Sequence, residues 1–120
     1  MAEDIVILVV DDEPNHADGI AEALEKNCDK AIPVYTGKDA LEILRSETVD
    51  IVVTDLKLDD EEIDGLAVLD AAKKNNPESE IILITAYATI DTCEDAIKRG
   101  AYDYLVKPID IDQHRTLVEQ

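Results

Sequence analysis

The chain has 120 residues, a length that suits one domain spanning residues 1–120. Its 29 acidic and 11 basic residues give a net charge of −18, and so acidic a surface repels nucleic acid and anionic membranes. The first apolar run, Ile5–Val10, is too short for a secretory signal or a membrane span. We therefore expect a cytoplasmic protein that contacts neither nucleic acid nor membrane.

Five short apolar segments are predicted to form strands. In chain order they are Ile5–Val10, Ala31–Tyr35, Ile51–Val53, Ile81–Ile84 and Tyr104–Val106. Most of them lack the polar alternation of a half-exposed strand, and strands without that alternation are covered on both faces. The pattern predicts a parallel sheet between two layers of helices.

Between these segments, apolar residues recur at the spacing of one helical face. The four sets are Ala17, Ile20, Ala21 and Leu24; Ala40, Leu41 and Leu44; Leu66, Leu69 and Ala72; and Ile90, Cys93 and Ile97. Pro14 suits the first turn of the first helix, Thr36 is a candidate N-cap of the second, and Gly100 closes the fourth. Cys93 is interpreted as a small core residue, and a last helix is predicted to begin near Asp110.

Strands and helices alternate strictly along the chain, which predicts a doubly wound α/β fold with right-handed crossovers. In open sheets of this kind, ligands bind beyond the carboxyl ends of the strands. Polar residues that follow the strands are therefore candidates for a site. They are Asp11 and Asp12 after the first strand, Asp55 after the third, Thr85 after the fourth and Lys107 after the fifth.

Three carboxylates in one small pocket repel each other. At about 4 Å and an effective dielectric constant near 20, each pair costs on the order of 4 kcal/mol, and a divalent cation removes this cost. Ligation by carboxylate oxygens and water suits Mg²⁺. Alternatively, Asp11 and Asp12 only cap the first helix, as acids before a helix often do. The polar residues after the other strands favour the metal site.

Asp55 can be a nucleophile as well as a ligand, because a carboxylate can attack phosphorus to form an acyl phosphate. Such a transfer depends mainly on positioning and on neutralising the phosphoryl oxygens. Mg²⁺ would neutralise one oxygen, Lys107 a second, and the Thr85 hydroxyl or backbone N–H groups the third. The sequence supplies each of these parts once.

Four short motifs contain these polar residues: the acidic pair in VVDDEP, the single aspartate in VVTDLKL, the Thr-Ala step in LITAY and the Lys-Pro step in YLVKPID. In their order and spacing they resemble the receiver domains of response regulators in two-component signalling. The resemblance covers essentially the whole chain. The segment from Ile84 to Asp112 is most similar to receivers of σ54-dependent transcriptional activators.

The resemblance implies a flavodoxin-like (βα)5 fold with a five-stranded parallel sheet of order 2-1-3-4-5. It also implies that Asp55 is the phosphoacceptor. Asp12, Asp55 and the backbone carbonyl of Lys57 would bind Mg²⁺ directly, and Asp11 would hold the ion largely through water.

A switch is also implied by the resemblance. Thr85 and Lys107 would contact the phosphoryl oxygens, and Tyr104 would turn into the space that Thr85 vacates. The surface of residues 90–99, residues 102–106 and the last helix would then change, allowing dimerisation or control of an output domain. A sensor histidine kinase would donate the phosphoryl group. The chain would catalyse only its own phosphorylation and dephosphorylation, and in a longer protein an ATPase and a DNA-binding module are expected to follow.

Two further positions are expected to tune the lifetime of the acyl phosphate. Lys57 lies two residues after Asp55, and Tyr87 lies two residues after Thr85. Both would flank the path of a water molecule that attacks phosphorus. Ordinary exposure at the rim of the site is the equally weighted alternative.

The segment after the phosphoacceptor departs from the family pattern. It has no proline, and the acidic run Asp59–Glu62 makes the loop somewhat longer than in many receivers. We interpret the run as a solvated loop, with a role in metal binding or kinase docking as the alternative. His16 and His114 are interpreted as surface residues without partners.

Three other functions fit the sequence less well. A Mg²⁺-dependent phosphatase would need a DxD motif after the first strand, where the chain has Val10-Asp11-Asp12-Glu13. A flavin-binding module would need a phosphate loop rich in Ser, Thr and Gly at the same place. A degenerate interaction domain without metal is opposed by the complete set of site residues.

Overall fold

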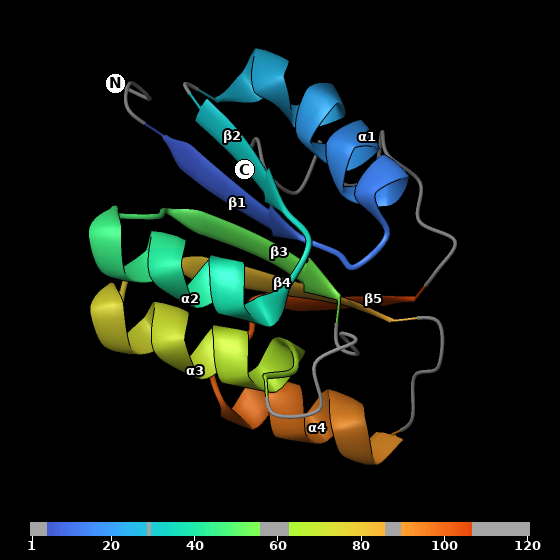
Figure 1. Cartoon of the computed structure of the whole chain (residues 1–120). Coiled ribbons are helices and arrows are strands. Elements are labelled where there is room, and N and C mark those ends of the chain that lie inside the picture. Colours follow the sequence, from blue (N-terminus) through green and yellow to red (C-terminus); the bar gives the residue numbers. More distant parts are fainter. Residues whose placement is uncertain (1–4, 29, 56–62, 86–89, 107–120) are drawn as a thin grey trace.

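The computed structural model describes residues 5–28, 30–55, 63–85 and 90–106, which form a sheet between helices (Figure 1). For residues 27, 90, 92, 93 and 104–106 only the backbone is described. Several predictions lie outside the described residues, namely those for Lys57, the Asp59–Glu62 run, Tyr87, Lys107, His114 and the last helix.

Within the described ranges, five parallel strands form one sheet. They are β1 (Val6–Val10), β2 (Lys30–Val34), β3 (Ile51–Asp55), β4 (Glu80–Thr85) and β5 (Asp103–Val106). Their order across the sheet is β2-β1-β3-β4-β5, which confirms the expected flavodoxin-like fold. Pro33 lies in β2, at the edge of the sheet, where a missing backbone donor is tolerated.

The helices lie in two layers (Figure 1). They are α1 (Pro14–Leu24), α2 (Gly37–Ser46), α3 (Gly65–Asn75) and α4 (Ile90–Lys98), with a short 3-10 turn, η1 (Glu25–Asn27), after α1. Figure 1 shows α1 on one side of the sheet and α2, α3 and α4 on the other. Of the helices that the structure describes, none is long and apolar enough to cross a membrane.

Alternating residues of the strands pack into two separate hydrophobic cores, one on each face of the sheet. Beneath α2, α3 and α4 the buried sheet residues include Leu8, Val52, Ile81 and Leu83. Beneath α1 they include Ile7, Val9, Ile51 and Val53. Because side chains alternate across a strand, a fully apolar strand fills both cores at once. The prediction of a sheet covered on both faces is therefore confirmed.

The predicted apolar face of α3 packs against the core, whereas that of α4 differs at Ile97. In α3, Leu69 and Ala72 are buried as predicted, and the partly buried Leu66 packs against the same core, which Val68 joins. Among the α4 side chains that the structure describes, Ala96 is fully buried and Ile97 is 50% exposed, so the prediction for Ile97 was wrong. The two residues are adjacent, and packing against the sheet decides which of them is buried.

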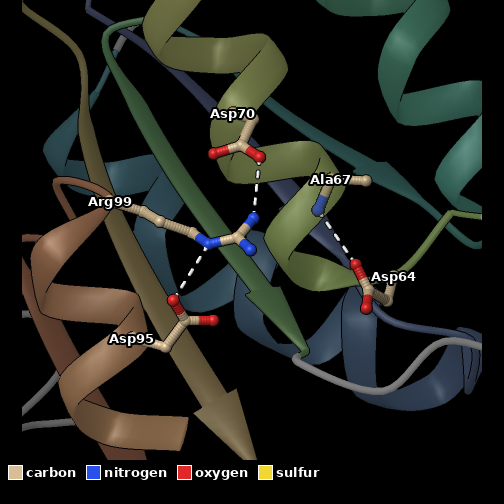
Figure 2. Close-up of polar contacts among 5 residues, drawn as sticks. All are labelled: Asp64, Ala67, Asp70, Asp95 and Arg99. Carbon is tan, nitrogen blue, oxygen red and sulfur yellow. Dashed lines mark hydrogen bonds and ion pairs between the residues drawn. The ribbon is translucent and has the colours of Figure 1, made fainter.

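Helix ends follow the signals in the sequence. The Thr36 hydroxyl accepts a hydrogen bond from the Asp39 N–H at 3.0 Å, so Thr36 is the N-cap of α2 as predicted. Asp64 caps α3 in the same way, accepting from the Ala67 N–H at 2.9 Å (Figure 2). Gly100 ends α4 with a φ of 103°, a left-handed conformation that favours glycine.

Gly37, the first residue of α2, packs against Ile63, which precedes α3. A Cβ at Gly37 would lie 2.7 Å from the backbone oxygen of Ile63, closer than real Cβ contacts. The start of α2 and the chain entering α3 therefore approach each other at a distance that only glycine permits.

Candidate metal and phosphoryl site

The carboxyl ends of β1, β3 and β4 meet at one edge of the sheet. The pairing of β1 with β3 runs up to Val10 and Thr54, so the next residue of each chain segment, Asp11 and Asp55, lies at the same level. Thr85 ends β4, the neighbouring strand on the other side of β3. The strand order thus brings together the acids and the hydroxyl that the sequence singles out.

Three carboxylates converge at this edge. One oxygen each of Asp11, Asp12 and Asp55 lies within 4.8 Å of the others. Asp11 is only 3% exposed and Asp55 only 8%, while Asp12 is half-buried. Like charges held this close out of solvent repel each other, and a hard divalent cation takes such an all-oxygen donor set. The residues present therefore fit a divalent metal ion.

The turn between β1 and α1 fixes the acidic pair. The Asp11 N–H donates to the Val34 carbonyl at 3.2 Å, which extends the pairing of β1 with β2 by one residue. The Glu13 N–H then donates to the Asp11 carboxylate at 3.0 Å. Pro14 begins α1, and the Ala17 N–H donates to the Glu13 carbonyl at 3.0 Å. The acidic pair therefore lies in a tight turn.

His16 has a partner that sequence reasoning missed. Its Nδ1 lies 2.8 Å from Oδ2 of Asp11, and its side chain is 36% exposed. The expectation of a surface histidine without a partner was therefore wrong. The two positions are five apart in the sequence, and the first turn of α1 brings the ring back over the end of β1. No motif in the sequence marks this contact.

Thr85 is buried, with 2% of its surface exposed. Its strand pairs with β5, which places Thr85 opposite Val106 and Leu83 opposite Tyr104. Lys107 follows Val106 directly, but it lies outside the described residues, as does the side chain of Tyr104. The contact of Lys107 with a phosphoryl oxygen and the switch role of Tyr104 remain predictions.

The sequence profile of the response regulator receiver domain family matches residues 7–119. The chain belongs to this family. It is therefore a receiver domain, a phosphorylation-dependent signalling switch, and the family decides against the phosphatase and flavin-binding alternatives.

Known relatives agree with this assignment. The transcriptional regulatory protein ZraR of Salmonella typhimurium is 38% identical over 117 residues, covering 97% of this chain and 26% of ZraR. The structure of NtrX from Brucella abortus in complex with ATP is 34% identical with a TM-score of 0.83, covering 99% of this chain and 26% of NtrX. These relatives confirm the resemblance to receivers of σ54-dependent activators, and this chain spans about a quarter of their length.

A third relative bears on the chemistry. The structure of a response regulator from Burkholderia pseudomallei contains a phosphorylated aspartic acid, a calcium ion and citrate. It is 28% identical to this receiver domain with a TM-score of 0.81, and the match covers 98% of this chain and 67% of that one. A divalent cation and a phosphorylated aspartate thus occur together in a protein of this fold.

Next to the site, Tyr35 links the chain after β2 to α1. Its hydroxyl donates to the Asp18 carboxylate at 2.6 Å. The hydrogen bond and the negative charge of Asp18 raise the pKa of Tyr35 above its ordinary value of 10.0, because both favour the protonated hydroxyl. This hydrogen bond thus links α1 to the residue that follows β2 at the carboxyl edge of the sheet.

On the side of the sheet opposite α1, Arg99 joins α4 to α3. Its Nη1 lies 2.8 Å from Oδ2 of Asp70 in α3, and its Nε lies 3.2 Å from Oδ1 of Asp95 in α4 (Figure 2). The hydrogen bond that Arg99 donates to Asp95 and the charges of both acids raise the pKa of Arg99, so the guanidinium stays charged. The receiver domain therefore has a polar clamp between the two helices beyond its apolar core.

Proposed function

We propose that this receiver domain accepts a phosphoryl group on Asp55, with Mg²⁺ held by Asp11, Asp12 and Asp55. The observation that carries the proposal is the convergence of the three carboxylates within 4.8 Å at the end of the central strand. Mg²⁺ suits a site that combines a few carboxylates with water, because this small ion keeps part of its hydration shell.

Asp55 is the best nucleophile of the three acids. Asp11 lies in the turn after β1, where the Glu13 N–H and His16 bond to its carboxylate. Asp12 lies in the turn after β1 and is more exposed than the other two. Asp55 ends a strand that is buried along its whole length, so its backbone position is the most firmly fixed. Fixed position is what an in-line displacement requires.

In the transfer, an oxygen of Asp55 forms a bond to phosphorus while the bond from phosphorus to the donor nitrogen breaks. The donor imidazole leaves with the electron pair and takes up a proton. When bound, Mg²⁺ would neutralise charge on the phosphoryl oxygens. Thr85 and Lys107 would contact the remaining oxygens, and the backbone carbonyl of Lys57 would complete the metal ligands.

The donor is expected to be a phosphohistidine of a sensor histidine kinase. The domain would act only on itself, by taking the phosphoryl group and later hydrolysing the acyl phosphate, and on no separate substrate. Lys57 and Tyr87 would set the rate of that hydrolysis. The relatives' naming as transcriptional regulators supports a cytoplasmic location.

Phosphorylation would change the surface formed by α4 and β5, which would transmit the signal. Thr85 would move toward the phosphoryl group and Tyr104 would turn into the vacated space, shifting the population between two states of this surface. Two large side chains on it, Ile97 and Tyr102, are 50% and 45% exposed. Exposed apolar side chains of this kind suit a contact with a second copy or an output domain.

Intact-mass measurement after incubation with acetyl phosphate and Mg²⁺ tests the proposal. Wild type should gain one phosphoryl group, and Asp55→Asn and a chelated sample should gain none. Asp91→Asn makes the same change at an exposed aspartate in α4 and should behave as wild type. Phosphorylation that persists in Asp55→Asn would assign the acceptor role to another residue, and no phosphorylation of wild type by any donor would refute the proposal.

A further inference from the structure

We propose that His16 is a positioning residue for the metal site, acting through Asp11. The inference rests on the proposed function, because it assigns a residue to the Mg²⁺ site described there. His16 lies in the first turn of α1 and reaches back to the end of β1, where its Nδ1 is 2.8 Å from Oδ2 of Asp11. A carboxylate can only accept, so Nδ1 carries the proton and donates.

Two donors hold the Asp11 carboxylate in one orientation. The Glu13 N–H bonds Oδ1 at 3.0 Å, and His16 bonds Oδ2 at 2.8 Å. Asp11 itself is 3% exposed, and its N–H is bonded to β2. A buried carboxylate with a fixed backbone can still rotate about its side-chain bonds, and the pair of donors on opposite oxygens prevents this rotation.

The orientation matters because Asp11 shares the site with Asp12 and Asp55. Each contributes an oxygen within 4.8 Å of the others, a geometry that a rotated Asp11 would lose. Residues that form hydrogen bonds to a metal-binding group and so orient it contribute to metal affinity, and their removal typically weakens metal binding roughly 10- to 100-fold. The helix α1 therefore takes part in building the site through the imidazole of His16.

Substitutions at position 16 separate the hydrogen bond from other effects. His16→Leu removes the donor. His16→Asn keeps a donor nitrogen attached to Cγ, as Nδ1 is, without the ring and without the possibility of a charge. Asn15→Leu makes the same change to leucine at the neighbouring exposed position and serves as the matched control.

The measurement is the affinity for Mg²⁺ alone, followed by backbone amide shifts of the intact chain in a magnetic-resonance titration. His16→Leu should weaken binding roughly ten-fold, while His16→Asn should restore it to within a few-fold and Asn15→Leu should leave it unchanged. In an Asp11→Asn background, His16→Leu should have little further effect, because the residue acts through Asp11. A merely structural role for the ring would give equal losses in both backgrounds.

The outcomes distinguish this inference from the proposed function. If wild type binds Mg²⁺ and is phosphorylated but His16→Leu binds the ion equally well or more tightly, the role of His16 is refuted and the proposed function stands. Failure of His16→Asn to restore binding would also refute the donor role. If wild type binds no Mg²⁺, both proposals fall together.

Discussion

Replacing Asp55 by asparagine should make the metal-free domain more stable. Asp55, Asp11 and Asp12 hold oxygens within 4.8 Å of one another. At this separation and an effective dielectric constant near 20, each charged pair costs roughly 3 kcal/mol, and Asp55 takes part in two pairs. The hydrogen bond from His16 to Asp11 and the partial exposure of Asp12 reduce the repulsion. We expect a net gain of about 1–3 kcal/mol in the free energy of unfolding for Asp55→Asn.

Urea unfolding with and without Mg²⁺ measures this effect. Mg²⁺ should stabilise wild type and reverse the order of the two proteins, because a ligand that binds only the folded state adds to its stability. Asp50→Asn is the control: Asp50 accepts a hydrogen bond from the Val6 N–H at 2.9 Å, at the other end of β3. It should not gain stability. An Asp55→Asn domain that is no more stable than wild type without Mg²⁺ would show that the carboxylates do not repel each other.

Three further predictions follow from other contacts. Because its pKa is raised, Tyr35 should ionise above pH 10.0 in an absorbance titration. Its stabilising hydrogen bond to Asp18 is present below pH 10.0 and is lost as the pH rises through the raised pKa. Asp18→Asn should return the pKa of Tyr35 toward its ordinary value of 10.0. Gly37→Ala should lower the free energy of unfolding by about 1–3 kcal/mol through overpacking, whereas Gly19→Ala, with no neighbour within 4 Å, should raise it by up to about 1 kcal/mol. Arg99→Gln should speed amide hydrogen exchange in α4 more than in α3. Equal exchange rates in wild type and variant would show that the contacts of Arg99 do not stabilise α4.

Much of the fold was predictable because each strand is a short run of aliphatic residues that can be buried on both faces. The strands fix the edge at which Asp11, Asp55 and Thr85 meet, and this placement needs no knowledge of the helices. The N-cap at Thr36 was predictable for a similar reason, since a hydroxyl at a helix start bonds locally.

Contacts that depend on the rotation or tilt of a helix could not be predicted. In α4, Ala96 is buried and the adjacent Ile97 is half-exposed, and packing of the helix against the sheet decides which of the two is buried. The bond between His16 and Asp11 depends on where the first turn of α1 lies over β1. The clamp of Arg99 joins residues 29 positions apart that no local pattern connects. The roles of Lys57, Tyr87, Tyr104 and Lys107 stay predictions.

The complete burial of β3 limits the insertions and deletions that this domain tolerates. Val52 faces one core and Val53 the other, and Thr54 is also fully buried. Inserting or deleting one residue before Asp55 would exchange the two cores and turn the acceptor away from the acids, because side chains alternate along a strand. Residues added beyond Lys57 lie outside this alternation, because β3 ends at Asp55. Length variation among relatives should therefore accumulate on the C-terminal side of the acceptor, where this sequence carries its acidic run.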